Sequence, residues 1–538
     1  MRQVISALLL LLCAVALQAQ VPIHTEPEVF VTAIDIVADV RDASGKVPAG
    51  LTIADFAVLE EGTEMELLGL EYLRSTPTPA TPAGAAPADA ATDTPPASAG
   101  RGDWQVVIYF ETYLTSTFNR KRIASSLTKK VDELVRMGKV DVVLADPVPR
   151  SLLRGSRDPV AITAALKQAG NHPGASWLTS HRRDYYVTKM MGNGYTTTPA
   201  RIVLPYIEEE VKVLMFFRNS LLKWLSSYGR YSPRALIMAM EGFDLDPLAF
   251  YGDTIVVEEL MALQSYVDQA QLADSMNRTG QALAAGGWTT ISVPGDVTTG
   301  WLDDTAMSGV GRIRSYLITG EASDMRPGPR SFVYRPLEPL AVMAEATGGS
   351  VVNKLGKLGA AIDGLSDRIK ITYQVARPPD SKVRNVVVRA RRPDLKVSAM
   401  KWATSTTPEQ MSEARAIGLL TGGPGGELAL DVSTTWDESN AERRKGKLRL
   451  TTNIDSAKAI LPSQARVMVR VTFAIQVENK GTFLLNRLVT DYGGSTGPFK
   501  YNAPLEIPND AATIVVVVEE INTGIWGYVR LPVNKAAS

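Results

Sequence analysis

The sequence predicts a multi-domain chain in which a central α/β domain is combined with all-β domains. The chain has 538 residues, too many for one compact core. Across residues 102–369, short apolar runs alternate with longer helical patterns, which is typical of a doubly wound parallel sheet with helices on both faces. On either side of this region, apolar and polar residues alternate with a period of two, which predicts β-strands.

The composition is that of a folded protein without a global charge bias. Hydrophobic residues make up 45% of the chain and charged residues 21%, as in ordinary globular proteins. Lys+Arg and Asp+Glu both number 57, which removes any global electrostatic case for nucleic acid or anionic lipid. We therefore expect no nucleic acid among its partners.

Residues 1–19 have the features of an export signal. Arg2 is followed by the short apolar run Ser6–Leu17, and cleavage is expected near Ala19. This run is too short for a comfortable membrane span, and no later segment has the apolar length of one, so we expect no membrane span in the mature chain. Cys13 is the single cysteine and would leave with the signal. The absence of cysteine from the mature chain, and so of disulfides, favours a bacterial periplasmic or extracellular location for this exported protein.

Two β-rich segments flank the α/β region in the sequence. Residues 20–75 are expected to form part of a β-sandwich, followed at 76–101 by a disordered linker rich in Pro and Ala. Residues 370–405 return to β-type alternation and are expected to complete the same sandwich. This arrangement would make the α/β domain an insertion in one β-domain, and it predicts direct pairing of Val29–Tyr72 with Ile371–Trp402.

The end of the chain is predicted to form a separate domain. Residues 406–426 are expected to be a second linker, since they include the break GGPGG. Residues 427–538 contain several short alternating strands with turn residues between them, which predicts a C-terminal β-sandwich.

Four segments in the right order resemble a bacterial group of von Willebrand factor A-related proteins, of an acidobacterial type. They are VRDASGKVPAGLTIADFAVLEEG, SPRALIMAMEGFD, LAVMAEATGGSVV and ITYQVARPPDSKVRNVVVRARRPDLKVSA. The similarity extends over about residues 27–405. It implies a von Willebrand A-like doubly wound parallel sheet, flanked here by β-sandwich domains, that serves in adhesion or protein–protein interaction.

The resemblance also implies a metal-ion-dependent adhesion site. In the family this site combines D-x-S-x-S after the first strand, a Thr in a second loop and an Asp after the fourth strand, all ligands suited to Mg²⁺. In this chain the matching positions carry Glu111, Tyr113, Thr115, Ser156 and Glu241. Thr115 and Ser156 keep a hydroxyl, but each Glu carries its carboxylate one methylene further out. Tyr113 is expected to fill or cover the site, because a phenol cannot replace a short hydroxyl.

Two interpretations of these positions remain. In the first, Glu111, Thr115, Ser156 and Glu241 hold a rearranged, weak Mg²⁺ or Mn²⁺ ion, with help from the sequence neighbours Asp244 or Asp246. In the second, which the Glu and Tyr substitutions favour, no cofactor binds. The two glutamates then hydrogen-bond to loop amides and helix N-termini.

The leading functional hypothesis is an exported, non-enzymatic binding or adhesion-type protein with a degenerate metal site. One alternative is a metal-dependent adhesion module. Another is a hydrolase that uses Glu111 and Glu241 as an acid–base pair, and a third is a purely structural envelope component. A nucleophile-elbow pattern at 493–497 lacks the strand–turn–helix setting, and the three histidines lack zinc-ligand spacing.

Overall fold

The computed structural model describes most of the chain, namely residues 32–73, 104–174, 199–228, 233–243, 245, 247–251, 259, 263–267, 271–295, 337–420, 422–423, 426, 428–439, 443–454, 467–477, 481–489, 498–521 and 523–533. The predicted export signal and the predicted linker over 76–101 lie outside these residues, as do Asp244, Asp246 and the glycine-rich motif at 493–497.

A six-stranded sheet forms the centre of the α/β domain. In spatial order its strands are β10 (Ser350–Val351), β9 (Trp288–Val293), β8 (Arg234–Ala239), β5 (Trp104–Glu111), β6 (Gly138–Ala145) and β7 (Pro149–Ser156). Counted from the edge strand β7, the strands follow the order 3-2-1-4-5-6 of a doubly wound sheet. The direction in which successive strands are added reverses between β5 and β8.

The sequence predicted a wholly parallel sheet, and this prediction is wrong for one strand. Strand β7 runs antiparallel to β6, whereas the other neighbours are parallel. The physical reason is the connection between them. Only residues 146–148 separate β6 from β7, and so short a turn can join two adjacent strands only in antiparallel orientation.

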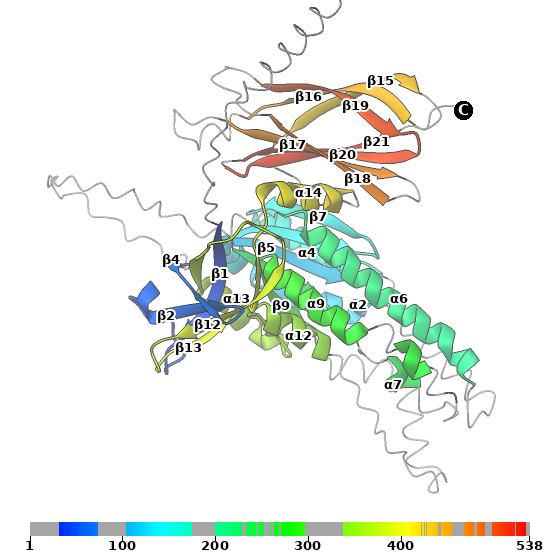
Figure 1. The fold of residues 1–538 in the computed structure, drawn as a ribbon. Helices are drawn as coiled ribbons and strands as arrows, with labels where there is room; N and C mark the ends of the chain where they lie inside the picture. Colours follow the sequence, from blue (N-terminus) through cyan, green and yellow to red (C-terminus); the bar gives the residue numbers. More distant parts are fainter. Residues whose placement is uncertain are drawn as a thin grey trace, which may run out of the picture.

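Helices cover both faces of this sheet (Figure 1). Successive residues of β5 point to opposite faces, so that Ile108 joins one hydrophobic core and Tyr109 the other. The first core includes α2 (Thr117–Thr128), α3 (Val131–Met137), α4 (Pro159–Asn171) and α13 (Leu358–Ser366), which follows the short 3-10 turn η4 (Leu355–Lys357). The second includes α6 (Ala200–Leu225), α7 (Pro247–Tyr251), α9 (Leu272–Ala285) and α12 (Glu338–Ala346).

Two four-stranded antiparallel sheets form the N-terminal sandwich. One has the order β13 (Lys396–Ala399), β1 (Thr32–Arg41), β11 (Ile369–Val375), β4 (Leu67–Tyr72). The other has the order β14 (Trp402–Thr404), β12 (Val383–Ala390), β2 (Phe56–Glu60), β3 (Thr63–Met65), with the 3-10 turn η1 (Ile53–Asp55) before β2.

The predicted pairing of the two distant β-rich segments is confirmed. Ile36 of β1 lies opposite Ile371 of β11, and Val58 of β2 lies opposite Val388 of β12. In Figure 1 the blue strands β1 and β2 accordingly lie among the yellow strands β12 and β13. The core of this sandwich is continuous with the core on one face of the α/β sheet.

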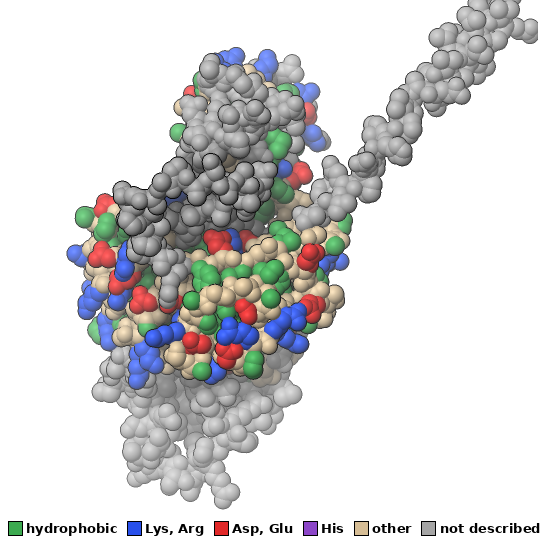
Figure 2. All heavy atoms as spheres, turned by 90° about the vertical axis from the view of Figure 1, so that its left-hand side faces the viewer, with side chains coloured by type: hydrophobic (Ala, Val, Ile, Leu, Met, Phe, Trp, Pro, Cys, Tyr) green, Lys and Arg blue, Asp and Glu red, His purple; other side chains and the backbone are tan. Residues whose placement is uncertain are grey.

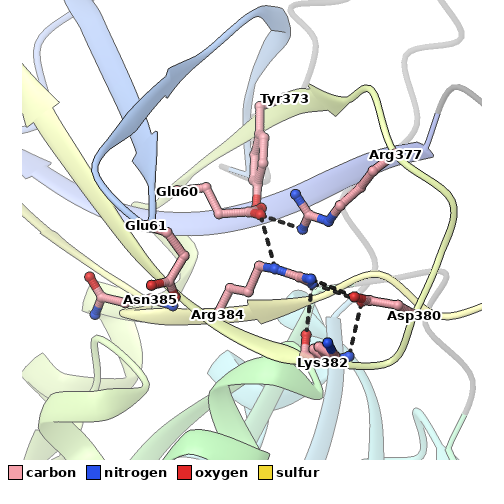
Figure 3. Close-up of polar contacts among 8 residues, drawn as sticks. All are labelled: Glu60, Glu61, Tyr373, Arg377, Asp380, Lys382, Arg384 and Asn385. Carbon is pink, nitrogen blue, oxygen red and sulfur yellow. Dashed lines mark hydrogen bonds and ion pairs between the residues drawn. The ribbon is translucent and has the colours of Figure 1, made fainter.

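A buried carboxylate ties three strands of this sandwich together (Figure 3). Glu60 at the end of β2 is 2% exposed and accepts a hydrogen bond of 2.8 Å from the Tyr373 hydroxyl on β11. Arg377 forms an ion pair with the same carboxylate, and Nε of Arg384 on β12 lies 3.8 Å from it. Asp380 in turn pairs with Arg384, so the turn between β11 and β12 is fixed to the sandwich.

The C-terminal sandwich packs a three-stranded sheet on a four-stranded one. The sheets have the orders β15 (Leu430–Ser439), β16 (Arg443–Thr452), β19 (Phe499–Pro508) and β18 (Gly481–Val489), β17 (Val469–Val477), β20 (Ala511–Glu520), β21 (Trp526–Pro532). Apolar residues of both sheets share one core, which includes Leu448, Phe473, Phe499 and Val516.

Residues 406–426, predicted to be a linker, contain helix α14 (Pro408–Leu419). Thr407 and Gln410 form a capping box at its start. The helix lies between the C-terminal sandwich and the rest of the molecule (Figure 1). It packs Ala416 and Leu419 against β17 and β20. On its other side, Ser226 at the end of α6 donates to the Ala414 carbonyl at 3.3 Å. Residues 408–419 therefore form a packed helix rather than a free linker.

The surface agrees with the absence of net charge. On the face shown in Figure 2, acidic and basic side chains are interspersed, and neither sign dominates. Among the described residues, no helix combines the length and the apolarity needed to cross a membrane.

Candidate functional site

The candidate site lies where the strand order of the α/β sheet reverses. Strands β5 and β8 are parallel neighbours, and their carboxyl ends carry Glu111 and Glu241. Open α/β sheets bind their ligands in the crevice at such a switch point. The parallel pairing thus brings these two predicted residues to the same edge of the sheet, and the loop from Thr112 to Ser116 lies between β5 and α2.

Glu111 is held by the loop that follows it. The residue is 4% exposed, and its carboxylate accepts hydrogen bonds from the backbone N–H groups of Tyr113, at 3.1 Å, and Leu114. Burial raises the pKa of Glu111 from 4.5 to about 7, although these two hydrogen bonds and the charge of Arg120 act in the opposite direction. The carboxylate is therefore part of the loop structure.

Glu241 caps the helix that leaves the same loop. One oxygen of its carboxylate accepts from the Ser116 N–H at 2.8 Å, from the Ser116 hydroxyl and from Asn119 Nδ2 at 2.8 Å. Ser116 is itself the N-cap residue of α2, so the carboxylate lies where a helix N-terminus favours negative charge. Burial nevertheless raises the pKa of Glu241. The hydrogen bonds expected from both glutamates in the second interpretation are thus present.

A buried arginine supplies positive charge at this edge. Arg120 on α2 is fully buried, and its guanidinium donates to the carbonyls of Thr112, at 3.2 Å, and Thr115. It also donates to the carbonyls of His172 and Pro173 at 2.7 and 2.9 Å. Burial lowers the pKa of Arg120, and the charges of the nearby carboxylates oppose this. An arginine in a protein stays protonated, so the loops enclose a fixed cation.

A third carboxylate follows β6 at the same edge. Oδ1 of Asp146 accepts from the Thr112 hydroxyl at 3.0 Å, and its other oxygen lies 3.3 Å from Nε2 of His172. Because Nδ1 of His172 accepts from the Gly174 N–H, the neutral ring carries its proton on Nε2, facing Asp146. A Cβ at Gly174 would lie 2.5 Å from the Arg120 guanidinium, so this position requires glycine.

The other predicted ligands divide into two groups. Thr115 is buried at the site, but its hydroxyl points to the Ala239 carbonyl at 3.4 Å. Tyr113 is partly buried in the same loop, and its covering role stays a prediction. Ser156 is not at the site. It pairs with Val140 near the start of β6, because antiparallel β7 carries its last residue to the opposite end of the sheet.

This set of oxygens does not fit a bound Mg²⁺ ion. The two glutamates already accept N–H donors, the Thr115 hydroxyl faces a carbonyl, and the Arg120 charge lies among them. A hard cation needs free oxygen ligands in near-octahedral geometry. Within the described parts of the chain, no group of three or more His, Cys, Asp or Glu residues is arranged to hold a metal ion.

Sequence reasoning missed Asn119, Arg120 and Asp146. Asp146 follows a buried strand directly, so the strand-end rule that identified Glu111 applies to it equally. Arg120 begins the run RKR on an amphipathic helix, where solvent exposure is the usual expectation. Its burial depends on the loop at 172–174, which lies far away in the sequence.

Neither a protein-family model nor a curated protein matches the chain. Among solved structures, the chain is similar to the conserved hypothetical protein BatB from Bacteroides thetaiotaomicron. The match covers 49% of this chain and 99% of that one, with a TM-score of 0.23 and 8% sequence identity. A likeness at this level supports no inference about fold or function.

Proposed function

We propose that the chain is an exported, non-enzymatic binding protein that contacts a protein partner through the carboxyl edge of a von Willebrand A-like domain, without a metal ion. One observation carries the proposal. The buried Arg120 guanidinium donates to loop carbonyls at the place where the resemblance implies a cation. An internal cation of this kind holds the loops in position without an exchangeable ion.

The same edge offers contact area for a protein partner. Phe118, at the start of α2, is 55% exposed, and the Arg122 guanidinium lies over its ring at 5.4 Å. Val148, in the turn after β6, is also exposed. Aromatic and arginine side chains are enriched among the residues that dominate protein interfaces.

An acid–base role of the two glutamates is the weaker alternative. A catalytic carboxyl group must reach the proton that it transfers. Glu111 and Glu241 are both almost fully buried and accept hydrogen bonds from their own loops, so a substrate would first have to open this structure. We therefore favour binding over hydrolysis.

The first test concerns the metal ion. We expect the melting temperature of the purified protein to be the same in excess EDTA, in Mg²⁺ and in Mn²⁺, since the loops depend on Arg120 instead. A rise in melting temperature with either ion, reversed by EDTA, would instead support the metal-dependent adhesion module.

The second test concerns the binding edge. A photo-crosslinkable phenylalanine analogue at position 118 should capture a specific exported protein of the source organism, with and without EDTA. The matched control places the analogue at Val160, which is 77% exposed but lies at the start of α4, at the opposite end of the sheet. Equal capture from both positions, or capture from neither, would contradict the proposal.

A further inference from the structure

A crevice lies at the opposite, amino end of the α/β sheet, where three parts of the molecule meet. A cavity of about 240 Å³ is lined by the start of β1, the start of β8, the end of α9 and residues 400–406. A second cavity of about 360 Å³ lies beside it, under α14. Arg234, Thr404, Thr406 and Met411 line both cavities, so the two form one crevice.

The first cavity contains buried polar groups. Arg234 is 3% exposed, and its Nη1 donates to the Gly286 carbonyl at 2.9 Å. Ser405 is 1% exposed, and within the described chain its hydroxyl has no hydrogen-bond partner. The buried hydroxyl of Thr406 likewise makes no hydrogen bond to a described residue. Leaving such hydroxyls unsatisfied is costly, which favours a ligand or water that bonds to them.

The second cavity is mostly apolar. Leu222, Leu225, Trp288 and Met411 contribute to its wall, and the Trp288 ring lies 5.4 Å from the Arg234 guanidinium. The crevice therefore combines one buried cation and several hydroxyls with an adjoining apolar space. Ligand sites of proteins commonly have this composition, lie between domains and have volumes of about 300–1,000 Å³.

We propose that this crevice binds a small molecule with a single carboxylate group and a short apolar tail. The carboxylate would bond to the planar fork of Arg234 and to Ser405, because guanidinium and carboxylate match in a bidentate pair. The tail would occupy the space beside Trp288 and Met411. A monoanion fits better than a phosphate, since Asp35 lines the same cavity and Lys370 is already paired with Glu71 at 2.6 Å.

Calorimetry with a series of probes tests the proposal. Butyrate, hexanoate and octanoate are titrated into the purified protein, with hexan-1-ol and hexylammonium as controls that lack the carboxylate. We expect hexanoate to bind more tightly than butyrate, because its tail buries more apolar area. We also expect it to bind about tenfold or more tightly than hexan-1-ol, because the alcohol lacks the charge-assisted hydrogen bonds. Equal binding of acid and alcohol, or no binding of any acid, would overturn the proposal.

Variants locate the site. Arg234→Gln should weaken hexanoate about tenfold while leaving hexan-1-ol unchanged, and Arg234→Lys should retain part of the affinity. Met411→Trp, which fills the apolar space, should weaken both ligands. Arg449→Gln, on an exposed face of the C-terminal sandwich, is the matched control. Should Arg234→Gln fail to fold, Met411→Trp and Ser405→Ala still decide the question, because unchanged hexanoate affinity in both would exclude this crevice.

Discussion

Burial controls the protonation of Glu111. Its pKa lies near 7 in the folded protein and near 4.5 in its ordinary state. The folded protein therefore holds a proton that the unfolded chain has already lost between these pH values. The stability that this proton provides is complete below pH 4.5 and is lost as the pH rises through 7. The difference of about 2.5 between the two pKa values corresponds to about 3 kcal/mol.

We therefore predict that Glu111→Gln changes the pH dependence of folding. We measure the free energy of unfolding by urea titration from pH 4 to pH 8. Over this range it should fall by up to about 3 kcal/mol more in the wild type than in the variant. Glu133→Gln is the control, since this glutamate is partly exposed and its pKa is lowered, so its loss should leave the fall in stability toward pH 7 in place. Parallel profiles for wild type and Glu111→Gln would refute the prediction.

The Arg120 guanidinium is predicted to be a major contribution to stability. Arg120→Met removes hydrogen bonds to four backbone carbonyls and leaves three carboxylates without their buried cation. Removing one partner of a buried charge group costs about 3–5 kcal/mol. Chemical denaturation should show this loss for Arg120→Met and a change below about 1 kcal/mol for Arg122→Met on the same helix. Similar small effects of both variants would show that the internal cation is dispensable.

The sequence located some residues of the site because strand ends can be read from apolar patterns. Glu111 ends one buried strand and Glu241 follows another, and the two strands are parallel neighbours, so their shared edge was predictable. Ser156 was misplaced, because its position depends on the direction of β7, which a short turn fixes. The role of Arg120 depends on a loop more than fifty residues away, at 172–173. Contacts of that kind leave no local pattern in the sequence.

Helix α14 shows the same contrast at the scale of secondary structure. The segment Thr407–Gln410 reads TPEQ, which is a capping box with proline at the first helical position. The helix was therefore predictable from local signals that the interpretation as a linker passed over. Its docking was not, because the partners of Arg415 lie on β20 and β21, about a hundred residues later.

A buried ion pair anchors α14 on the C-terminal sandwich. Arg415 lies 3.1 Å from Glu519, both are almost fully buried, and the guanidinium lies 4.6 Å from the Trp526 ring. We predict that Arg415→Met or Glu519→Leu alone costs about 3–5 kcal/mol, because each leaves one charge unpaired. The double variant Arg415→Met with Glu519→Leu should be much closer to wild type. A double-mutant cycle in urea checks this, and strictly additive losses would contradict it.

The whole molecule depends on pairing between segments that are far apart in the sequence. Strands β1, β2 and β4 find their partners in β11, β12 and β13, and the resulting sandwich shares its core with one face of the α/β sheet. The order of motifs was enough to predict this pairing. The arrangement means that the α/β domain cannot be separated from the sandwich without exposing a continuous apolar surface.

A single cut between the N-terminal β-strands and the α/β domain tests whether the shared core holds the two parts together. A specific protease site placed in residues 76–101 would divide the protein into an N-terminal fragment with β1–β4 and a remainder. We expect the two fragments to co-elute in gel filtration, because β-ladders and the buried core still join them, and to separate only in denaturant. As a control, a second protein with Ile36→Asp and Val58→Asp, which bury charges in this core, should release the fragment after the same cut. Release of the fragment from the otherwise unaltered protein would show that the covalent connection, rather than the shared core, holds the sandwich together.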